Sequence, residues 1–392
     1  MLEHSRKLVS QLWNKRVAVL ISGGVDSCVA ASLLKPSVQK GNLVGVFMKN
    51  WEDDEDDERC QSQYETDRYD AKHVCDKLDI EFKEVNFVKE YWNHVFSHFM
   101  QDFENGLTPN PDILCNQRVK FGACLDYAVK QLNSDLIATG HYAGNSHGPL
   151  YETPCGNEHR MQLLRSRDTV KDQTFFLSRI NQDSLSKVLF PLHNYLKPEV
   201  KLIAEQMGFD RFQKKKSSKG ICFIGKRNYQ DFITKYMKPN PGKFVDYDTN
   251  EVVGEHKGFH YWTVGQHARI HSNVFKRKYY ILKKSSLDDN IIYVVSETNH
   301  PKLFNDIFEI GQPHWIGQEP SELSRGQELR CMYKWQQKDD LKSCSLSKIS
   351  SNSLKVKLYD KQRALTPGQY SAFYLDGICL GSARITNVEF EE

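Results

Sequence analysis

The sequence predicts an α/β protein in which a doubly wound parallel sheet is followed by a small mixed central domain and a C-terminal antiparallel β-barrel. Continuous apolar runs alternate with helical patterns in the first half of the chain, as expected for strands that are buried on both faces of a parallel sheet. From Gln327 onward, short segments alternate between apolar and polar residues, which is typical of half-buried antiparallel strands. We therefore expect three domains, over residues 14–220, 221–302 and 303–392.

The composition is that of a globular protein with two or three domains. Of the 392 residues, 39% are hydrophobic and 26% are charged, and the net charge of +3 does not by itself indicate a nucleic-acid partner. No apolar run approaches the roughly 20 residues of a membrane span, so we expect no membrane association. Ten cysteines occur without a C-x-x-C pair, which argues against zinc, an iron–sulfur cluster of the usual spacing and a secreted disulfide framework.

The first half of the chain alternates between strand and helix patterns. In a doubly wound sheet, ligands bind at the carboxyl ends of the strands, and Ser22, Met48 and Gly140 all lie at such ends. The expected strands cover residues 17–21, 43–48, 82–85 and 135–140, and the expected helices cover 26–34, 66–78, 88–105 and 116–132.

The pattern changes after about Phe190. One further helix is expected to end at Gly208, the segment 214–219 is basic, and Pro239 and Pro241 follow another helix. The expected helices cover residues 198–207 and 228–237, and the expected barrel strands cover 328–335, 343–349, 354–359, 369–375 and 378–385.

Residues 22–27, with the sequence SGGVDS, join the first strand to the first helix. Glycine lets the backbone approach a ligand closely, and free amides at a helix start favour negative charge. The loop is therefore a candidate phosphate site, although it lacks the lysine of the common G-x-x-x-x-G-K-[ST] loop. The alternative is a Gly-Gly turn without a ligand. The acidic run 52–58 could hold magnesium, but we interpret it as a solvated loop, because consecutive carboxylates usually mark one.

SGGVDS resembles the PP-loop of ATP pyrophosphatases, which cleave ATP between its α and β phosphates and leave AMP on the substrate. Five further motifs occur in the order found in tRNA-specific 2-thiouridylases, a family of this superfamily. The resemblance extends from about Lys15 to near the C-terminus. The motifs are NPDILCN at 110–116, ATGHY at 138–142, KDQTFFL at 171–177, GICFIG at 220–225 and PGQ at 367–369.

The resemblance implies that ATP transfers AMP to the 2-position oxygen of a wobble uridine and releases pyrophosphate. The 2-position oxygen, a poor leaving group, thereby becomes part of AMP, a good leaving group. Magnesium, for which Asp26 is a weak candidate ligand, would neutralise the developing charge. The implied ATP-binding residues are Leu20, Ile21, Ser22, Gly23, Gly24, Val25, Asp26, Ser27, Met48 and Gly140.

The resemblance also implies two catalytic cysteines. Cys222 matches the family cysteine that carries a persulfide, and Cys115 matches the partner that attacks or resolves it. A Cys115–Cys222 disulfide then remains and must be reduced. Thiolate is the reactive form, and both contexts are electropositive: Cys115 directly precedes the helix expected from Asn116. The basic neighbours are Arg118 and Lys120 for Cys115, and Lys214, Lys215, Lys216 and Lys219 for Cys222.

The other cysteines show no motif that suggests catalysis. Free cysteine is among the most buried residue types, so those in apolar-periodic contexts are expected in the core. We expect core positions for Cys28, Cys75, Cys124, Cys331 and Cys379, loop positions for Cys60 and Cys155, and a strand start at Cys344.

A uridine in an anticodon loop must be splayed out before its base can enter a pocket. For His141, a structural hydrogen-bonded role is the alternative to an RNA contact.

Relatives carry an Arg-aromatic pair where this chain has Met332-Tyr333, and the neighbouring lysine lacks the bidentate contact of arginine. The implied contacts with the target base or tRNA are Asn110, Pro111, Asp112, His141, Lys171, Asp172, Gln173, Tyr333, Lys334 and Gln369.

Residues 89–92 and 314–316 are most similar to the mitochondrial branch of the family, which implies a mitochondrial protein, with the cytoplasm as the alternative. The first 16 residues fit either a short amphipathic targeting signal or a surface helix. The implied partners are a tRNA with a wobble uridine, a protein that donates persulfide sulfur and a reductant for the disulfide.

Two other functions agree with parts of the sequence. A PP-loop ligase would adenylate a carbonyl for attack by an amine, and it would need no paired cysteines. A non-catalytic tRNA-binding module could retain the fold. The loop at 22–27 together with Cys115 and Cys222 favours the 2-thiouridylase.

Overall fold

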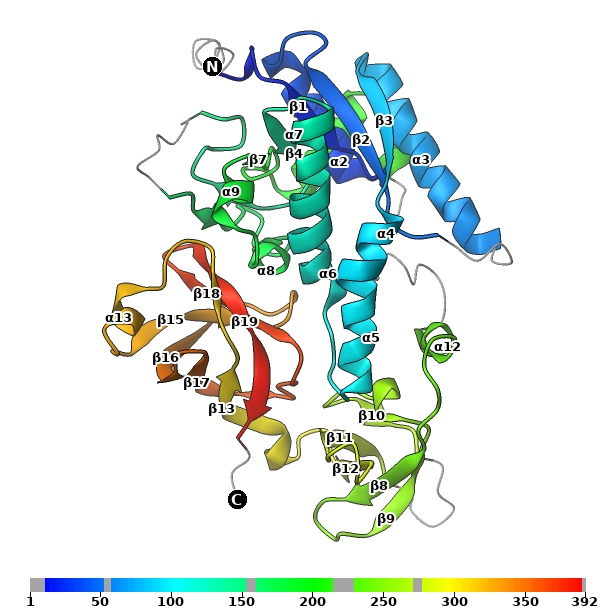
Figure 1. Cartoon of the computed structure of the whole chain (residues 1–392), viewed down its shortest axis with the longest axis vertical. Helices are drawn as coiled ribbons and strands as arrows, with labels where there is room; N and C mark the ends of the chain where they lie inside the picture. The colour runs from blue at the N-terminus through cyan, green and yellow to red at the C-terminus, as the bar shows by residue number, and fades with distance from the viewer. Residues whose placement is uncertain (1–10, 53–57, 153–159, 214–228, 271–276, 390–392) are drawn as a thin grey trace.

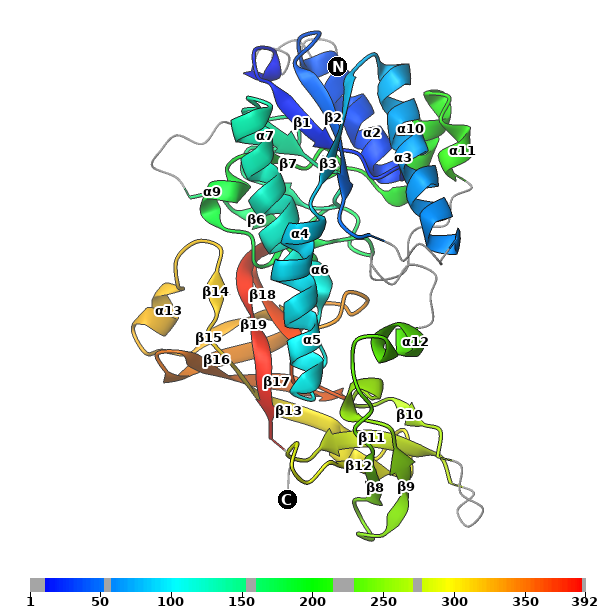
Figure 2. The same ribbon diagram turned by 45° about the vertical axis from the view of Figure 1, so that its right-hand side comes forward.

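The computed structural model describes residues 11–52, 58–152, 160–213, 229–270 and 277–389 (Figure 1). The parallel sheet lies at one end of the molecule and a small central sheet lies at the other, with the barrel beside the helices that run between them (Figures 1 and 2). Within the described ranges, no helix is long and apolar enough to cross a membrane.

The parallel sheet has the strand order β3-β2-β1-β4-β7. Strand β1 (Val17–Leu20) is buried along its whole length, and its side chains alternate between two core clusters, with Val17 and Val19 in one and Ala18 and Leu20 in the other. The sheet is therefore covered on both faces, which confirms the prediction from the continuous apolar run. The other strands are β2 (Leu43–Lys49), β3 (Glu81–Asn86), β4 (Leu136–Ala138) and β7 (Val188–Leu189).

The helices around this sheet begin and end close to the expected positions, with three differences. α3 begins at Glu58, so Cys60 lies in a helix and not in a loop. The helix expected over 88–105 contains the π-helical segment η2. The helix expected from residue 116 already begins at Pro111. The bounds are α2 (Val25–Leu34), α3 (Glu58–Leu78), α4 (Val88–Tyr91), η2 (Trp92–Phe96), α5 (Ser97–Glu104), α6 (Pro111–Leu114), η3 (Cys115–Cys124), α7 (Leu125–Gln131), α8 (Thr174–Leu177), α9 (Gln182–Leu185), α10 (Lys197–Gln206) and α11 (Asp210–Gln213).

The central domain is a five-stranded sheet of order β10-β11-β12-β8-β9, in which only the β8–β12 pair is parallel. It packs against the end of α5, where Lys284 donates a hydrogen bond to the carbonyl of Gly106 at 2.7 Å. The sequence indicated only a mixed segment here. Its elements are α12 (Tyr229–Thr234), β8 (Gly242–Asp246), β9 (Val252–His256), β10 (His267–Ala268), β11 (Tyr279–Lys284) and β12 (Ile291–Val295).

The C-terminal sheet closes into an antiparallel barrel, because β13 pairs with both β17 and β19. All five expected strands are present, and β13 is an additional one. Two short strands from the first half, β5 (Gly144–Asn145) and β6 (Leu163–Leu164), extend the sheet beyond β19. The barrel strands are β13 (Phe304–Ile310), β15 (Leu329–Lys334), β16 (Lys342–Ser350), β17 (Ser353–Arg363), β18 (Tyr370–Leu375) and β19 (Ile378–Val388), and β14 (His314–Trp315) pairs with β19. The predicted fold class is thus confirmed.

Candidate active site

The loop at 22–27 curls around the hydroxyl of Ser27. The amide of Ser22 donates to Ser27 Oγ at 3.1 Å, and Ser27 Oγ donates to the carbonyl of Gly24 at 3.0 Å. Gly24 precedes α2 and supplies no side-chain cap, so the amides of the first turn keep their capacity to bind an anion. These features are compatible with a phosphate site, and that the loop binds a phosphate stays a prediction.

Two glycines allow close backbone packing around this loop. Gly23 has a φ of +71°, and a Cβ there would overlap the backbone of Asp67 in α3. A Cβ on Gly140 would lie 2.6 Å from the amide nitrogen of Ser27. Only glycine therefore lets the segment after β4 lie directly against the start of α2.

Met48 lies near the carboxyl end of β2, which is the other neighbour of β1 in the sheet. Since parallel strands end at the same edge, Met48 and Gly140 lie at the same sheet edge as the loop. That these residues bind adenosine stays a prediction.

Asp26, the one carboxylate of the loop, lies against a lysine that the sequence analysis missed. Lys197 Nζ lies 2.6 and 2.7 Å from the two carboxylate oxygens of Asp26, and the hydroxyl of Tyr142 donates to Oδ1 at 2.9 Å. Burial and the Asp26 carboxylate raise the pKa of Tyr142, so its phenol stays a donor. Lys197 begins α10 and lies 171 residues from Asp26 in the chain, and no local motif marked it.

The residues around Asp26 match a magnesium ligand only in part. Across the ranges that the structure describes, no group of three or more His, Cys, Asp or Glu side chains could hold a metal ion. Magnesium typically uses one or two carboxylates together with substrate phosphates, so a single carboxylate beside a phosphate loop is compatible with it.

Cys115 lies inside the helix that begins at Pro111, and not ahead of its N-terminus as the sequence suggested. The helix starts early because proline suits the first helical position and Asn110 before it is extended. Cys115 is 3% exposed and packs in the core cluster on one face of the parallel sheet, whereas Arg118 is exposed. Cys222 and the lysines of 214–219 lie outside the described residues, so the Cys115–Cys222 pairing stays a prediction.

The cysteines assigned to the core are buried, which confirms those assignments. Burial raises the pKa of Cys28, Cys75 and Cys124 to about 12, so their reactive thiolate forms are disfavoured. Cys344 is also buried, with its sulfur 3.6 Å from that of Cys331 across the β15–β16 pair. Cys155 lies outside the described residues. The buried set is Cys28, Cys75, Cys115, Cys124, Cys331, Cys344 and Cys379.

The predicted target-base residues lie at the start of the Cys115 helix. Pro111 is buried, and burial raises the pKa of the Asp112 carboxyl, an effect that Lys120 opposes. Gln369 in the barrel donates from Nε2 to the carbonyls of Thr108 and Pro109, at 3.0 and 3.2 Å. In this structure Gln369 therefore anchors the segment that leads to Asn110.

His141 is hydrogen-bonded as the alternative reading expected. Its Nδ1 lies 2.8 Å from Thr139 Oγ1, and its ring lies near those of Phe121 and Phe190. Burial, with a smaller effect of Lys120, lowers its pKa well below the usual value, so the imidazole is neutral at pH 7.

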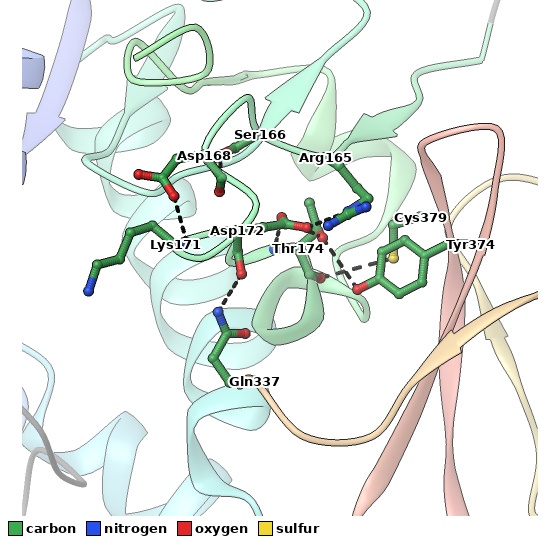
Figure 3. Close-up of polar contacts among 9 residues, drawn as sticks. All are labelled: Arg165, Ser166, Asp168, Lys171, Asp172, Thr174, Gln337, Tyr374 and Cys379. Atoms are coloured by element: carbon green, nitrogen blue, oxygen red, sulfur yellow. Dashed lines mark hydrogen bonds and ion pairs between the residues drawn. The ribbon is translucent and has the colours of Figure 1, made fainter. Parts of the chain in front are cut away.

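Asp172 is an internal link between the first domain and the barrel, as Figure 3 shows. It is 2% exposed; its carboxylate accepts from Arg165 Nε at 2.7 Å and from Thr174 Oγ1 at 2.8 Å, and its carbonyl accepts from Gln337. Thr174 in turn bonds Tyr374 in β18. This burial differs from the expectation that Asp172 contacts tRNA directly.

Lys171 and Gln173, which flank Asp172 in the sequence, lie outside its hydrogen-bonded cluster. The ammonium of Lys171 points away from the Asp172 cluster in Figure 3, and only its backbone amide bonds Asp168. Gln173 accepts a hydrogen bond from the amide of Tyr142 at 2.9 Å. Among the described residues, the Lys171 ammonium therefore has no ion-pair partner, and its contact with tRNA stays a prediction.

Tyr333 and Lys334 are also buried, at 1% and 3% exposure. Burial lowers the pKa of Lys334, and the charge of Asp172 opposes this shift. A contact of either side chain with tRNA would thus need a different conformation from the one seen here.

Three family models match the chain. They are described as the tRNA methyl transferase HUP domain over residues 15–226, the tRNA methyl transferase PRC-barrel domain over 230–296 and the aminomethyltransferase β-barrel domain over 305–385. Among solved structures, an NH3-dependent NAD synthetase from Campylobacter jejuni aligns with a TM-score of 0.32 and 17% identity, over 56% of this chain and 79% of that chain. No conclusion follows from so low a score.

Relatives match nearly the whole chain. The mitochondrial tRNA-specific 2-thiouridylase 1 of Drosophila melanogaster is 45% identical, over 95% of this chain and 94% of its own length. The human protein of the same name is 39% identical over 95% and 90%. The tRNA-specific 2-thiouridylase MnmA of Pectobacterium atrosepticum is 39% identical over 95% and 97%. The chain therefore belongs to the tRNA-specific 2-thiouridylases, a family of enzymes.

Proposed function

We propose that this protein is an ATP-dependent tRNA-uridine 2-sulfurtransferase that converts a wobble uridine into 2-thiouridine. The observation that carries the proposal is the loop at 22–27, whose uncapped helix start and close contact with Gly140 suit a nucleotide phosphate. The chain also matches a named 2-thiouridylase over 95% of its length. The substrate tRNA and the mitochondrial location are inferred from the names of those relatives. The proposed domains remain 14–220, 221–302 and 303–392.

The first step is adenylation of the uridine. The 2-position oxygen attacks the α-phosphorus of ATP, pyrophosphate leaves, and the oxygen becomes part of an AMP leaving group. The amides at the start of α2 would stabilise the charge on the phosphates. Magnesium held by Asp26 would supply further charge neutralisation when bound.

The second step replaces oxygen by sulfur. In one route the Cys115 thiolate attacks Sγ of the Cys222 persulfide, the terminal sulfur leaves as hydrosulfide, and hydrosulfide displaces AMP from the 2-position. In the other route the persulfide displaces AMP directly, and Cys115 then attacks Sγ of Cys222 to release 2-thiouridine. Both routes end in a Cys115–Cys222 disulfide, and a reductant must return two electrons before the next turnover.

The test is a reconstituted reaction. The protein is incubated with ATP, magnesium, a persulfide donor and an unmodified tRNA that has a wobble uridine, and the thionucleoside is measured by mass spectrometry. Cys115→Ser and Cys222→Ser should each abolish the product. Cys344→Ala, in the barrel core, is the control for loss of a buried thiol. Normal product from either serine variant would refute the cysteine roles, and AMP release without thiolation would favour the PP-loop ligase.

A further inference from the structure

Three arginines from distant parts of the chain converge on Tyr370, where the Cys115 helix meets the barrel. Arg118 lies in η3, Arg179 follows α8, and Arg384 lies in β19. The guanidinium carbon of Arg179 lies 5.6 Å from the centre of the Tyr370 ring. Arg384 is the cross-strand partner of Tyr370, and Arg118 is next in sequence to Gln117, which accepts a hydrogen bond from Arg179. Burial and Asp102 raise the pKa of Tyr370, and the charges of all three arginines oppose this shift. We call Arg118, Arg179 and Arg384 the arginine cluster.

The arginine cluster has more positive charge than its neighbours balance. Arg384 forms an ion pair with Asp102 at 2.8 Å. Within the described ranges, Arg179 has only a neutral hydrogen-bond partner, since its Nε donates to Gln117 Oε1 at 3.3 Å. Among the residues that the structure describes, neither Arg179 nor Arg118 pairs with a carboxylate. Burial and the two arginines also lower the pKa of the nearby His314, which stays neutral.

Such an arrangement is unfavourable without an anion. Arg179 is half-buried, and partial burial of a guanidinium costs free energy unless it is paired; neighbouring like charges add to that cost. Burial lowers the pKa of Arg179, and the charges of Arg118 and Arg384 act in the same direction, whereas Tyr370 opposes them. A bound anion would remove both penalties.

The position and chemistry of the arginine cluster favour a phosphodiester as that anion. The planar guanidinium matches two phosphate oxygens at once. Arg118 lies three residues after Cys115 in the same helix, and Tyr370 follows Gln369, which holds the backbone just before Asn110. The arginine cluster therefore lies beside the segment predicted to hold the target base.

We propose that the arginine cluster binds the ribose-phosphate backbone of the substrate RNA next to the target nucleotide. This inference rests on the proposed function, because it assigns a phosphate site to the same substrate. None of the three arginines belongs to the nucleotide loop at 22–27, so the cluster and the ATP site should be separable by mutation.

The experiment measures binding of a fluorescently labelled tRNA transcript to the full-length protein by anisotropy at several salt concentrations. Arg179→Gln and Arg118→Gln should each weaken binding about tenfold, as expected for loss of a charged hydrogen bond. Each should also lower the slope of log affinity against log salt by about 1. Arg179→Lys should bind with intermediate affinity, because it keeps the charge and loses the planar fork. ATP binding should not change in any of these variants.

Arg325→Gln is the matched control, because it removes one exposed guanidinium from another part of the barrel domain. Unchanged affinity and salt slope in Arg118→Gln and Arg179→Gln would overturn the proposal, as would an equal loss in the control. If Arg179→Gln does not fold, Arg118→Gln decides the question, because its side chain is exposed. If the wild type thiolates tRNA and the arginine variants bind tRNA normally, the arginine proposal fails and the proposed function stands. A wild-type protein that does not bind tRNA refutes both.

Discussion

Lys197 Nζ lies within 2.7 Å of both carboxylate oxygens of Asp26, so an ammonium group lies against the one carboxylate of the loop at 22–27. Tyr142 donates to the same carboxylate, and its amide bonds Gln173 in the predicted tRNA-contacting motif. The amide of Lys197 donates to Asp168, which also holds the amide of Lys171. The nucleotide loop and the motif at 171–173 are thus joined through two short hydrogen-bonded paths.

Lys197→Met should raise the KM for ATP about tenfold or more. Without the ammonium, the loop at 22–27 loses one neighbouring positive charge, and the Asp26 carboxylate loses a charged hydrogen bond of roughly 1.5–3 kcal/mol. Pyrophosphate release at varied ATP measures the effect. Lys187→Met, which removes an exposed lysine elsewhere in the domain, should behave as the wild type. If KM for ATP does not change in Lys197→Met, the ion pair has no role in nucleotide binding.

Gly140→Ala should disrupt the nucleotide site. The added Cβ would lie 2.6 Å from the amide nitrogen of Ser27, and forcing apart such packed backbones costs roughly 1–3 kcal/mol. Thermal unfolding and ATP binding by calorimetry should both show the loss. Gly317→Ala is the control, because nothing lies within 4 Å of a Cβ there. Normal ATP affinity in Gly140→Ala would contradict the close apposition of β4 and α2.

Asp172→Asn should lower stability, whereas Lys171→Gln should weaken tRNA binding. Asp172→Asn leaves Arg165 without its buried carboxylate and should lower the free energy of unfolding by about 2 kcal/mol. Lys171→Gln should leave stability unchanged and weaken tRNA binding, because its ammonium lies outside the cluster. Chemical denaturation and tRNA anisotropy measure the two effects. A fully stable Asp172→Asn protein with weak tRNA binding would show instead that Asp172 contacts RNA.

Lys284 should make stability rise with pH above neutrality. Burial lowers the pKa of Lys284 to about 7, whereas the unfolded value is about 10.4. Between these values the unfolded chain binds more protons, so the free energy of unfolding increases with pH by about 1 kcal/mol per unit. Well below the folded-state pKa, Lys284 is charged in both the folded and the unfolded state, so the full free-energy cost of burying its charge is present. The facing His256 and His260 have pKa values lowered by burial and stay neutral in this range.

Urea unfolding at pH 7, 8 and 9, values that span the range above the Lys284 pKa of about 7, compares the wild type with Lys284→Met. The variant should lack this pH-dependent gain and should be the more stable of the two at pH 7. Lys238→Met, at an exposed position in the same domain, is the control. Parallel pH profiles for wild type and Lys284→Met would show that Lys284 stays charged in the folded protein over the whole measured pH range.

Local patterns predicted the elements whose formation depends on nearby residues. The apolar run of β1, the glycines of the loop and the alternating strands of the barrel were all predicted because strand burial and turn conformation leave a direct periodic or glycine signal. The helix that contains Cys115 begins at Pro111 and not at residue 116, although Asn110 followed by Pro111 is a signal for a helix start.

By itself, the sequence determined the parallel sheet, the glycine-containing loop at its edge, the barrel and the family. Only the tertiary structure decided what surrounds each functional side chain. In the folded chain Lys197 pairs with Asp26, and Asp172 and Lys334 are buried. Gln369 bonds the backbone before Asn110, and the arginine cluster forms around Tyr370. The physical reason is that periodicity reports which face of an element is buried, whereas ion pairs and burial of charge depend on contacts between distant residues. Asp26 and Lys197 are 171 positions apart, and Thr108 and Gln369 are 261 positions apart.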